Sequence, residues 1–220
     1  MQTLKTQKDF FCTITAPKFI PNDSIEIYQD LIFLRFEDVI KSSLPIFSSL
    51  IDEDILTNYI KGFISYGAKT AYVWKIPFEF GEFLINTNKV TSKQYKDILK
   101  FELIQVKMYV SNDSFKYSKF NWNKRYRISS NAFILKTKAN ILNNNKKEQY
   151  ILIYKDFEDF EIYYIEITKV VYCFFKYLRN NHNAKQSLKL ACKSCGLVYK
   201  DVKDIINTTL NNFSKNGLII

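Results

Sequence analysis

The residue types that carry most enzymatic chemistry are scarce in this chain. Its one histidine, His182, lies in the polar stretch RNNHNAK, so a histidine-rich metal site is excluded and a catalytic histidine would depend on this side chain alone. The carboxylates Asp52, Glu53 and Asp54 precede an apolar run, where the dipole of a helix N-terminus favours negative charge, and they indicate a helix start rather than an acid/base pair. The five glycines form no phosphate-binding loop. We therefore expect no enzymatic activity and no cofactor in this chain.

The four cysteines give little support for a metal site. Cys192 and Cys195 form a CxxC pair, but a structural zinc site takes four ligands and the sequence has no second pair. Cys12 and Cys173 stand in apolar stretches that suit helix faces. We favour a structural role for the CxxC pair, with a redox or metal role as the alternative.

Length, cysteine usage and hydropathy favour a cytoplasmic protein. The chain has 220 residues and 47% apolar content, enough for a core without disulfides. The N-terminal stretch MQTLKTQKDFFCTITAPKF has no uninterrupted apolar segment. The longest apolar candidate, VVYCFF at 170–175, is bracketed by Lys169 and Lys176, so a membrane span is not expected.

The net charge of +10 belongs to the second half of the chain. Residues 1–110 hold 13 Lys and Arg against 13 Asp and Glu, whereas residues 111–220 hold 19 against 9. A local positive potential speeds encounter with anionic ligands, so the second half is expected to meet nucleic acid or an acidic polypeptide. The alternative is that the charge serves only solubility.

The first half predicts about six helices. Helical spacing runs through TLKTQKDFFCTI, and a cap at Asp23 or Ser24 opens the segment 24–43. Pro45 opens a short helix, and three further helices are expected in IDEDILTNYIKGFISYG, PFEFGEFLIN and TSKQYKDILKFELIQVKMYV. An antiparallel bundle or orthogonal array is the economical architecture. In the second helix, five apolar residues can share one stripe: Ile27, Leu31, Leu34, Val39 and Ile40.

The second half predicts three strands followed by three helices. The strand-like stretches are AFILKTKAN, QYILIYKD and DFEIYYIEIT, separated by the Asn-rich ILNNNKKE and a tight FED turn. Alternation puts Tyr150, Leu152 and Tyr154 on one face of the middle strand and Ile151, Ile153 and Lys155 on the other. The helices are KVVYCFFKYLRNN, a short one ended by Gly196, and one that Gly217 stops.

The expected fold class is therefore α+β, with an N-terminal helical bundle or array and a small three-stranded antiparallel sheet with winged-helix-like helices. The expected domains are residues 1–112, a junction over 113–130, and a strand-plus-winged-helix-like domain over 131–220.

Basic and aromatic residues alternate in FKYSKFNWNKRYR, residues 115–127, and Lys124, Arg125 and Arg127 form a basic patch there. Such a segment can stack bases and neutralise phosphates. It can also be a strap that packs its aromatics between two domains while its charges face water, which we favour. A winged helix can read DNA, but the last helix sets Asp201 and Asp204 against three lysines. Nucleic acid is therefore the second choice of partner.

The three-stranded sheet is the favoured binding element because it must have two edges. An extended peptide can add itself to an open edge, where backbone hydrogen bonds give affinity and alternate side chains give selectivity. Lys136 and Lys138 would favour an acidic peptide, although lysines can also simply blunt an edge. The candidate peptide-binding residues are Phe133, Leu135, Lys136, Lys138, Tyr150 and Tyr163. The sequence does not decide which edge is open.

The N-terminal half also resembles a known family. The resemblance lies in Gln7 with Phe10-Phe11, then in IYQDLIFLRFEDVIKSSLPIF, LTNYIKGFI, FGEFLI and YKDILKFELIQV. These stretches are similar to the HvfC/BufC/MbnC-like family, long catalogued as a DNA-binding domain. The matching positions are Tyr28, Arg35, Pro45, Tyr59, Ile60, Phe80, Phe83, Leu84 and Glu102. The chain departs from the family at Leu44, where phenylalanine is common, and in AKTAYVWKIPFEF.

This resemblance implies a partner subunit rather than an enzyme. Members of the family, including the ChrI-type partners, act with TIM-barrel multinuclear non-haem iron oxidases that modify ribosomally made peptides, often at cysteine. The iron and its ligands belong to the larger partner, so a heterodimer is implied. The winged-helix-like end resembles an element that captures the leader of the precursor peptide by strand addition. A DNA-binding transcriptional regulator is the alternative, and a structural adaptor that binds no peptide is a third possibility.

Overall fold

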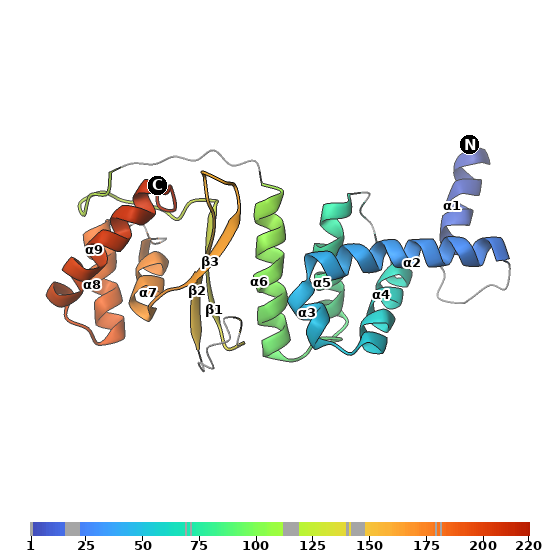
Figure 1. The fold of residues 1–220 in the computed structure, drawn as a ribbon, viewed down its shortest axis with the longest axis horizontal. Helices are drawn as coiled ribbons and strands as arrows, with labels where there is room; N and C mark the ends of the chain where they lie inside the picture. The colour runs from blue at the N-terminus through green and yellow to red at the C-terminus, as the bar shows by residue number, and fades with distance from the viewer. Residues whose placement is uncertain are drawn as a thin grey trace. The chain divides into compact units, whose positions relative to one another are not determined.

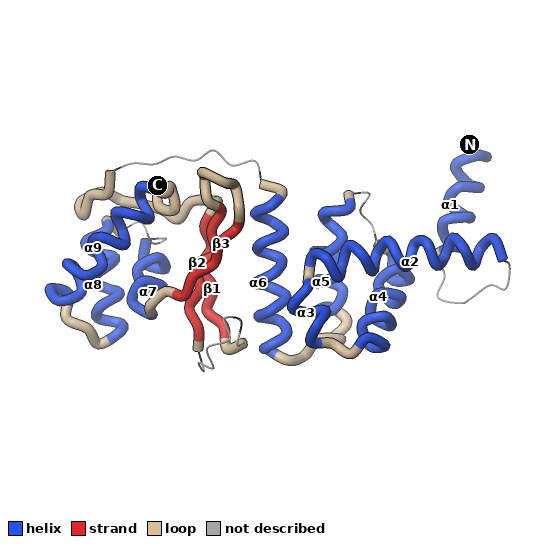
Figure 2. The backbone as a smooth tube through the Cα atoms, viewed as in Figure 1, coloured by secondary structure: helices blue, strands red, loops and turns tan. Residues whose placement is uncertain are grey.

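The computed structural model describes residues 2–15, 23–68, 70, 72–111, 119–139, 141, 148–178, 180 and 182–220. Within these residues the chain forms six α-helices, then three strands, then three α-helices (Figure 1; Figure 2). This order confirms the α+β class. The chain divides into two compact units, Met1–Val106 and Lys107–Ile220. No helix among the described residues combines the length and apolarity that a membrane crossing needs.

The helices of the first unit start and end where local sequence directs them. Pro45 opens α3, where its missing N–H is not needed. The side chain of Asp52 accepts hydrogen bonds from Asp54 N at 3.0 Å and Ile55 N at 3.3 Å, which caps α4. The helices are α1 (Gln2–Ile14), α2 (Asp23–Ser43), α3 (Pro45–Leu50), α4 (Glu53–Gly67) and α5 (Ile76–Asn86), the last preceded by a 3₁₀ turn, Val73–Lys75, and α6 runs from Lys93 to Tyr109 across the unit boundary.

Aromatic rings hold the core of the first unit. Phe63 on α4 is 2% exposed, and its ring centroid lies 5.8 Å from that of Phe36, 5.6 Å from Phe80 and 5.7 Å from Phe83. Offset and edge-on pairs at such distances add to the energy of simple burial. The C-terminal half of α2 is therefore fixed against α4 and α5.

The second unit is a three-stranded antiparallel sheet packed on three helices. β1 (Ala132–Thr137), β2 (Gln149–Lys155) and β3 (Ile162–Glu166) lie in the order β1-β2-β3, so β2 is central. Tyr150 and Leu152 belong to the hydrophobic core that the helices share, with Tyr154 packed against it, which confirms the predicted alternation along β2. The helices are α7 (Lys169–Leu178), α8 (Ala184–Cys195) and α9 (Tyr199–Lys215), and Gly196 ends α8 in the left-handed conformation at φ 69°.

The segment before β1 is tied to the rest of the second unit by its backbone. Trp122 O and Lys124 O accept the first N–H groups of α8, from Lys185 and Ala184 at 2.9 Å each, which satisfies donors that a helix start leaves open. Arg127 and Ile220 exchange two further hydrogen bonds, at 2.8 and 3.0 Å. Residues 119–130 are thus part of the second unit.

Candidate functional site

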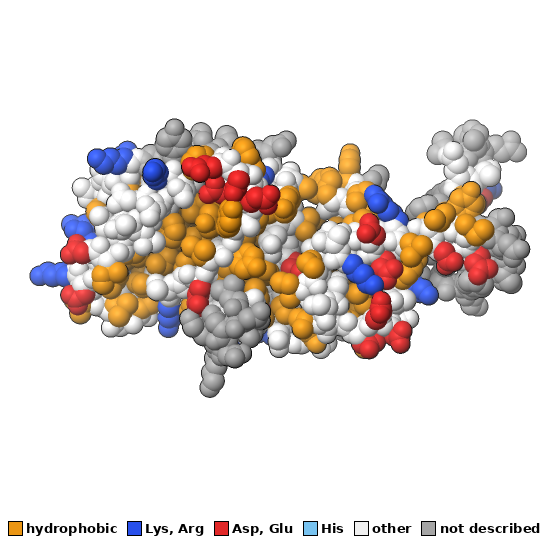
Figure 3. Space-filling view, in the orientation of Figure 1, with side chains coloured by type: hydrophobic (Ala, Val, Ile, Leu, Met, Phe, Trp, Pro, Cys, Tyr) orange, Lys and Arg blue, Asp and Glu red, His pale blue; other side chains and the backbone are white. Residues whose placement is uncertain are grey.

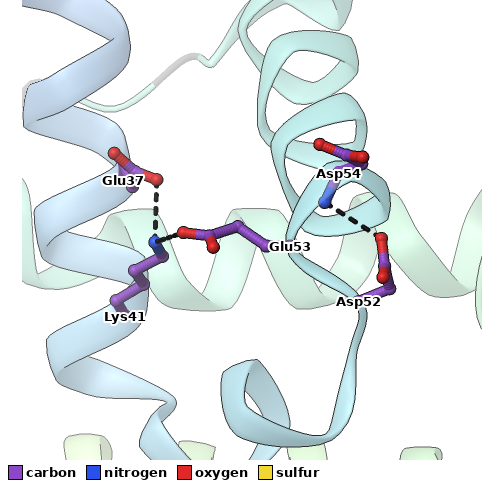
Figure 4. A network of polar contacts seen from close by, with 5 residues as sticks. All are labelled: Glu37, Lys41, Asp52, Glu53 and Asp54. Carbon is purple, nitrogen blue, oxygen red and sulfur yellow. Dashed lines mark hydrogen bonds and ion pairs between the residues drawn. The ribbon is translucent and has the colours of Figure 1, made fainter.

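The carboxylates singled out in the sequence form a structural network. Lys41 Nζ lies 2.9 Å from Glu37 Oε1 and 3.2 Å from Glu53 Oε1, while the Asp52 side chain turns to Asp54 N (Figure 4). The hydrogen bonds that Lys41 donates to Glu37 and Glu53 raise the pKa of Lys41. The prediction of a helix start is confirmed for this cluster. Within the described residues, no group of three or more His, Cys, Asp or Glu side chains could hold a metal ion.

The open backbone groups of the sheet lie on the outer edge of β1. Lys155 N donates to Asn131 O at 3.1 Å, so Asn131 and Lys155 form a hydrogen-bonded pair. Every second pair along the ladder is of this kind, so Phe133 with Ile153 and Leu135 with Ile151 are hydrogen-bonded pairs as well. Because bonded and non-bonded pairs alternate in an antiparallel ladder, the N–H and C=O groups of Ile134 and Lys136 point away from β2. The described residues offer these four groups no hydrogen-bond partner.

These groups are positioned to take an added strand. Ile134 is part-buried and Lys136 is exposed. Unpaired backbone groups away from water are rare because they are costly, so the edge between these two residues is expected to be hydrated in the free protein. A peptide strand placed there would replace that water with backbone hydrogen bonds.

The side chains of β1 point to two faces. On one face, Lys107 Nζ lies 5.4 Å from the centroid of the Phe133 ring, and Leu135 is 2% exposed. Lys155 on the same face donates to Met108 O at 3.2 Å and to Ser111 O at 3.3 Å. Phe133 can border a bound peptide. Leu135 contributes to the core instead, because its side chain is buried and its backbone groups pair with those of Ile151.

The other face carries a polar network. Lys136 Nζ lies 2.7 Å from Glu148 Oε1 and 5.7 Å from the centroid of the Tyr150 ring, and the Tyr150 hydroxyl donates to Glu148 Oε2 at 2.7 Å. The hydrogen bond from Lys136 lowers the pKa of Glu148, while burial, followed by the bond to Glu148, raises the pKa of Tyr150. Lys138 is exposed, and its charge also acts on Glu148. The formal charges of Lys136, Lys138 and Glu148 sum to +1.

β3 presents a different surface. Tyr163 is 43% exposed, stacks on Tyr154 with 5.9 Å between ring centroids, and donates its hydroxyl to Asp159 at 2.7 Å. That bond raises the pKa of Tyr163 and lowers the pKa of Asp159. Figure 3 shows acidic side chains gathered at the turn between β2 and β3 and apolar side chains across β3 below it. Tyr163 therefore lies on an acidic, aromatic surface, apart from the lysines of β1.

The basic patch is held in place by backbone hydrogen bonds within the second unit. Lys124, Arg125 and Arg127 are all exposed. The backbone of Lys124 is held by α8, and that of Arg127 by the C-terminal residue. Their charges face water, as the strap interpretation predicts.

The aromatics of this strap pack differently from the expectation. Phe120 and Tyr126 are 8% and 6% exposed, stack at 5.3 Å, and belong with Trp122 to the core of the second unit. The expectation that they lie between two domains is wrong for these three residues, since that core is formed by the sheet and α7–α9. Phe115, Lys116 and Tyr117 lie outside the described residues.

Helix α2 holds a surface that the sequence analysis assigned wrongly. Val39 and Ile40 are buried, but Ile27, Leu31 and Leu34 are 59%, 56% and 55% exposed. At 3.6 residues per turn, Leu31 and Leu34 share a face with Ile27, whereas Phe36 faces the opposite side and packs on Phe63. The five residues do not share one stripe, because α2 is apolar on two opposite faces. Counting turns from Ile27 would have revealed this. We call Ile27, Leu31 and Leu34 the α2 stripe.

Glu102 also has a role that could not be read from the sequence. It is 2% exposed, and its two carboxyl oxygens accept hydrogen bonds from Ile46 N at 2.6 Å and Phe47 N at 2.9 Å. These are the first donors of α3 after Pro45, which has none. Burial raises the pKa of Glu102 to about 7, against the opposing effect of the two backbone bonds. Glu102 thus caps α3 from α6. Among the described residues, its carboxylate bonds these two backbone N–H groups and no titratable side chain.

Comparison with protein-family models finds none that matches this chain, and comparison with curated proteins finds no significant match.

Proposed function

We propose that this chain is a non-catalytic partner subunit of a multinuclear non-haem iron oxidase that modifies a ribosomally made precursor peptide at cysteine. It binds the leader of the precursor as an added strand and presents the core of the peptide to the metals of a TIM-barrel partner. The observation that supports this best is the outer edge of β1, where the N–H and C=O groups of Ile134 and Lys136 point away from β2 without a partner among the described residues.

The geometry of this edge sets what it can bind. Two outward residues separated by one inward residue offer two donors and two acceptors, so an extended peptide can form up to four backbone hydrogen bonds. Phe133 borders the edge on one face and Lys136 on the other. The net positive charge of Lys136, Lys138 and Glu148 favours an acidic leader, whereas the acidic turn beside β3 would repel one.

The α2 stripe is the proposed contact with the oxidase. Three large apolar side chains, each more than half exposed, follow one helix face. Clustered exposed apolar residues mark protein interfaces in soluble proteins. The contact would be a helix face laid on an apolar surface of the partner.

Catalysis by such a subunit depends on positioning alone. Holding the leader raises the effective concentration of the peptide core at the partner's metals and restricts its orientation. No side chain of this chain is required to transfer a proton or an electron. The iron and its ligands belong to the partner.

The test compares two variants of one residue. Lys136→Ala removes the side chain but keeps the N–H, whereas Lys136→Pro also removes the outward N–H, a change that edge strands tolerate because no ladder bond is lost. Both are co-expressed with a candidate TIM-barrel iron oxidase and a short cysteine-containing candidate precursor peptide. We expect Lys136→Pro to bind the peptide at least 10-fold more weakly than Lys136→Ala, the equivalent of about 1.4 kcal/mol.

A matched control lies on the other edge. Asp156 N donates to Glu161 O at 2.9 Å, so the neighbouring pair, Lys155 with Ile162, is not hydrogen-bonded. The N–H of Ile162 on β3 therefore points away from β2. Ile162→Pro should leave peptide binding unchanged. If Ile162→Pro weakens binding and Lys136→Pro does not, the peptide binds at β3 and the assignment to β1 is wrong. If no peptide binds at all, the proposed function fails.

Docking is tested separately with Leu31→Lys. The lysine places a charge in the α2 stripe without touching β1, so the iron-containing complex should no longer co-purify while the isolated chain still binds the peptide. A complex that survives this change would show that the α2 stripe is not the contact with the oxidase.

A further inference from the structure

The two cysteines of the CxxC motif differ in burial. Cys192 is 1% exposed and belongs to the core of the second unit, whereas Cys195, one turn later on α8, is only half-buried. Cys195 Sγ lies 3.9 Å from Sγ of Cys173 on α7. Cys192, the thiol nearest to Cys195 in sequence, is therefore buried in the core. The thiol that Cys195 contacts is that of Cys173, 22 residues earlier in the chain.

Both members of this spatial pair are reachable from solvent. Cys173 and Cys195 are each half-buried and carry free thiols. Ser194 Oγ lies 3.8 Å from Cys195 Sγ. Burial raises the pKa of Cys195. The positive charge of Lys169, one turn before Cys173 on α7, acts in the opposite direction and favours the Cys195 thiolate. At the C-terminal end of α8 the helix dipole does not favour a thiolate, in contrast to CxxC motifs at helix N-termini.

We propose that Cys173 and Cys195 are a site of reversible disulfide formation, closed by exchange with a low-molecular-weight disulfide and opened by thiols. The thiolate of one cysteine attacks a sulfur of the small disulfide and releases one small thiolate, leaving a mixed disulfide. The thiolate of the second cysteine then attacks the protein sulfur, and the second small thiolate leaves. Two protein sulfurs are oxidised by one electron each, the small disulfide is reduced by two electrons, and both cysteine protons go to solvent.

The fold permits the closure. The two sulfurs must approach from 3.9 Å to the length of a disulfide, about 2 Å. Cys195 is the last residue of α8 and is followed by Gly196 in the left-handed conformation, so its position can adjust without strain on the helix. Closure would join α7 to α8 directly. Because Cys173 is among the groups that raise the pKa of Tyr150, the Cys173–Cys195 disulfide would lie close to the network of Tyr150, Glu148 and Lys136.

The experiment uses the full chain with reduced and oxidised glutathione as the probe. After equilibration, free thiols are alkylated and the protein is digested and mapped by mass spectrometry. We expect a peptide pair joined through Cys173 and Cys195 that has lost two hydrogen atoms, with Cys192 alkylated only after unfolding. The closed form should melt about 10 °C above the reduced form, because the bond closes a loop of about 20 residues.

Cys192→Ser and Cys195→Ser separate the alternatives. Cys192→Ser should still form the disulfide, and Cys195→Ser should not. Should Cys192→Ser fail to fold, the alkylation rates of the wild-type chain decide, since Cys173 and Cys195 should react and Cys192 should not. A Cys192–Cys195 bond, a bond between two chains through Cys12, or mixed disulfides that never close would each overturn the proposal.

Discussion

The two units differ in the groups that they bury and in the groups that they expose. The first unit buries a carboxylate, Glu102, and leaves the apolar α2 stripe exposed. The second buries the aromatic side chains of its strap and exposes the basic residues among them, and the second half of the chain holds the whole net charge. An exposed apolar helix face suits a protein surface, and an open strand edge beside positive charge suits an acidic peptide. This contrast is the reason why the proposed function assigns the two kinds of binding to different units.

The largest effect should come from breaking the first unit's aromatic core. Phe63→Ala should cost about 3–5 kcal/mol, because it removes a ring packed on three others and leaves a cavity. Urea unfolding followed by Trp74 fluorescence in a Trp122→Phe background measures this, since each unit contains one tryptophan.

The matched control for that experiment is on the surface of the same unit. Phe10 is 45% exposed and meets the Tyr28 ring edge-on at 5.5 Å, so Phe10→Ala should cost no more than about 1 kcal/mol. Equal losses for the two variants would mean that the interior and the surface of the first unit do not differ as described.

The next effect in size is the pH dependence that Glu102 gives to the first unit. Its pKa in the folded chain is about 7, above the ordinary value of 4.5. A raised pKa means that the folded state holds the proton more tightly, so this contribution is fully present below pH 4.5 and is lost as pH rises through 7. Stability should therefore fall by about 3 kcal/mol over that range, as measured by urea unfolding at a series of pH values.

Glu102→Gln is the variant that isolates this effect. It keeps one acceptor for the start of α3 but cannot titrate, so the decline in stability between pH 5 and 8 should flatten. A variant that keeps the full decline would assign it to another group. Glu102→Ala should be less stable than Glu102→Gln, because it leaves the N–H groups of Ile46 and Phe47 without an acceptor.

The parts of this structure that could be predicted depend on local periodicity. Alternation along Tyr150–Lys155 is fixed by the geometry of a strand, and the stops at Gly196 and Gly217 follow from the backbone freedom of glycine. Contacts between distant residues leave no such pattern. Glu102 bonds residues more than 50 positions away, and Cys195 meets a thiol on another helix.

The candidate site shows the same limit. The charge of Lys136 and its place on β1 were evident from the sequence, but its ion pair with Glu148 depends on the register of β1 and β2. That register also decides which backbone groups face outward. It could not be obtained from strand assignments alone, because shifting a strand by one residue exchanges its two faces.

A small effect on stability is expected at the α2 stripe. Leu31 is 56% exposed, so Leu31→Lys should change the free energy of unfolding by no more than about 0.5 kcal/mol. Leu84→Lys is the contrast, because Leu84 is fully buried in the same unit and a charge there should prevent folding. If Leu31→Lys is as damaging as Leu84→Lys, the α2 stripe is part of the core and the difference between the two units disappears.

The smallest effect should appear at the polar network beside β1, and it concerns a proton rather than stability. Tyr150 has its pKa raised first by burial and then by the hydrogen bond it donates to Glu148. Glu148→Gln removes the negative charge but not the burial, so the pKa of Tyr150 should fall toward, yet stay above, its ordinary value of 10.0. Ultraviolet titration of tyrosinate, compared with a Tyr150→Phe chain, measures the shift. A Tyr150 pKa that does not move would mean that Glu148 does not accept a hydrogen bond from the Tyr150 hydroxyl, and the polar network beside β1 would then be reduced to the ion pair of Lys136 with Glu148.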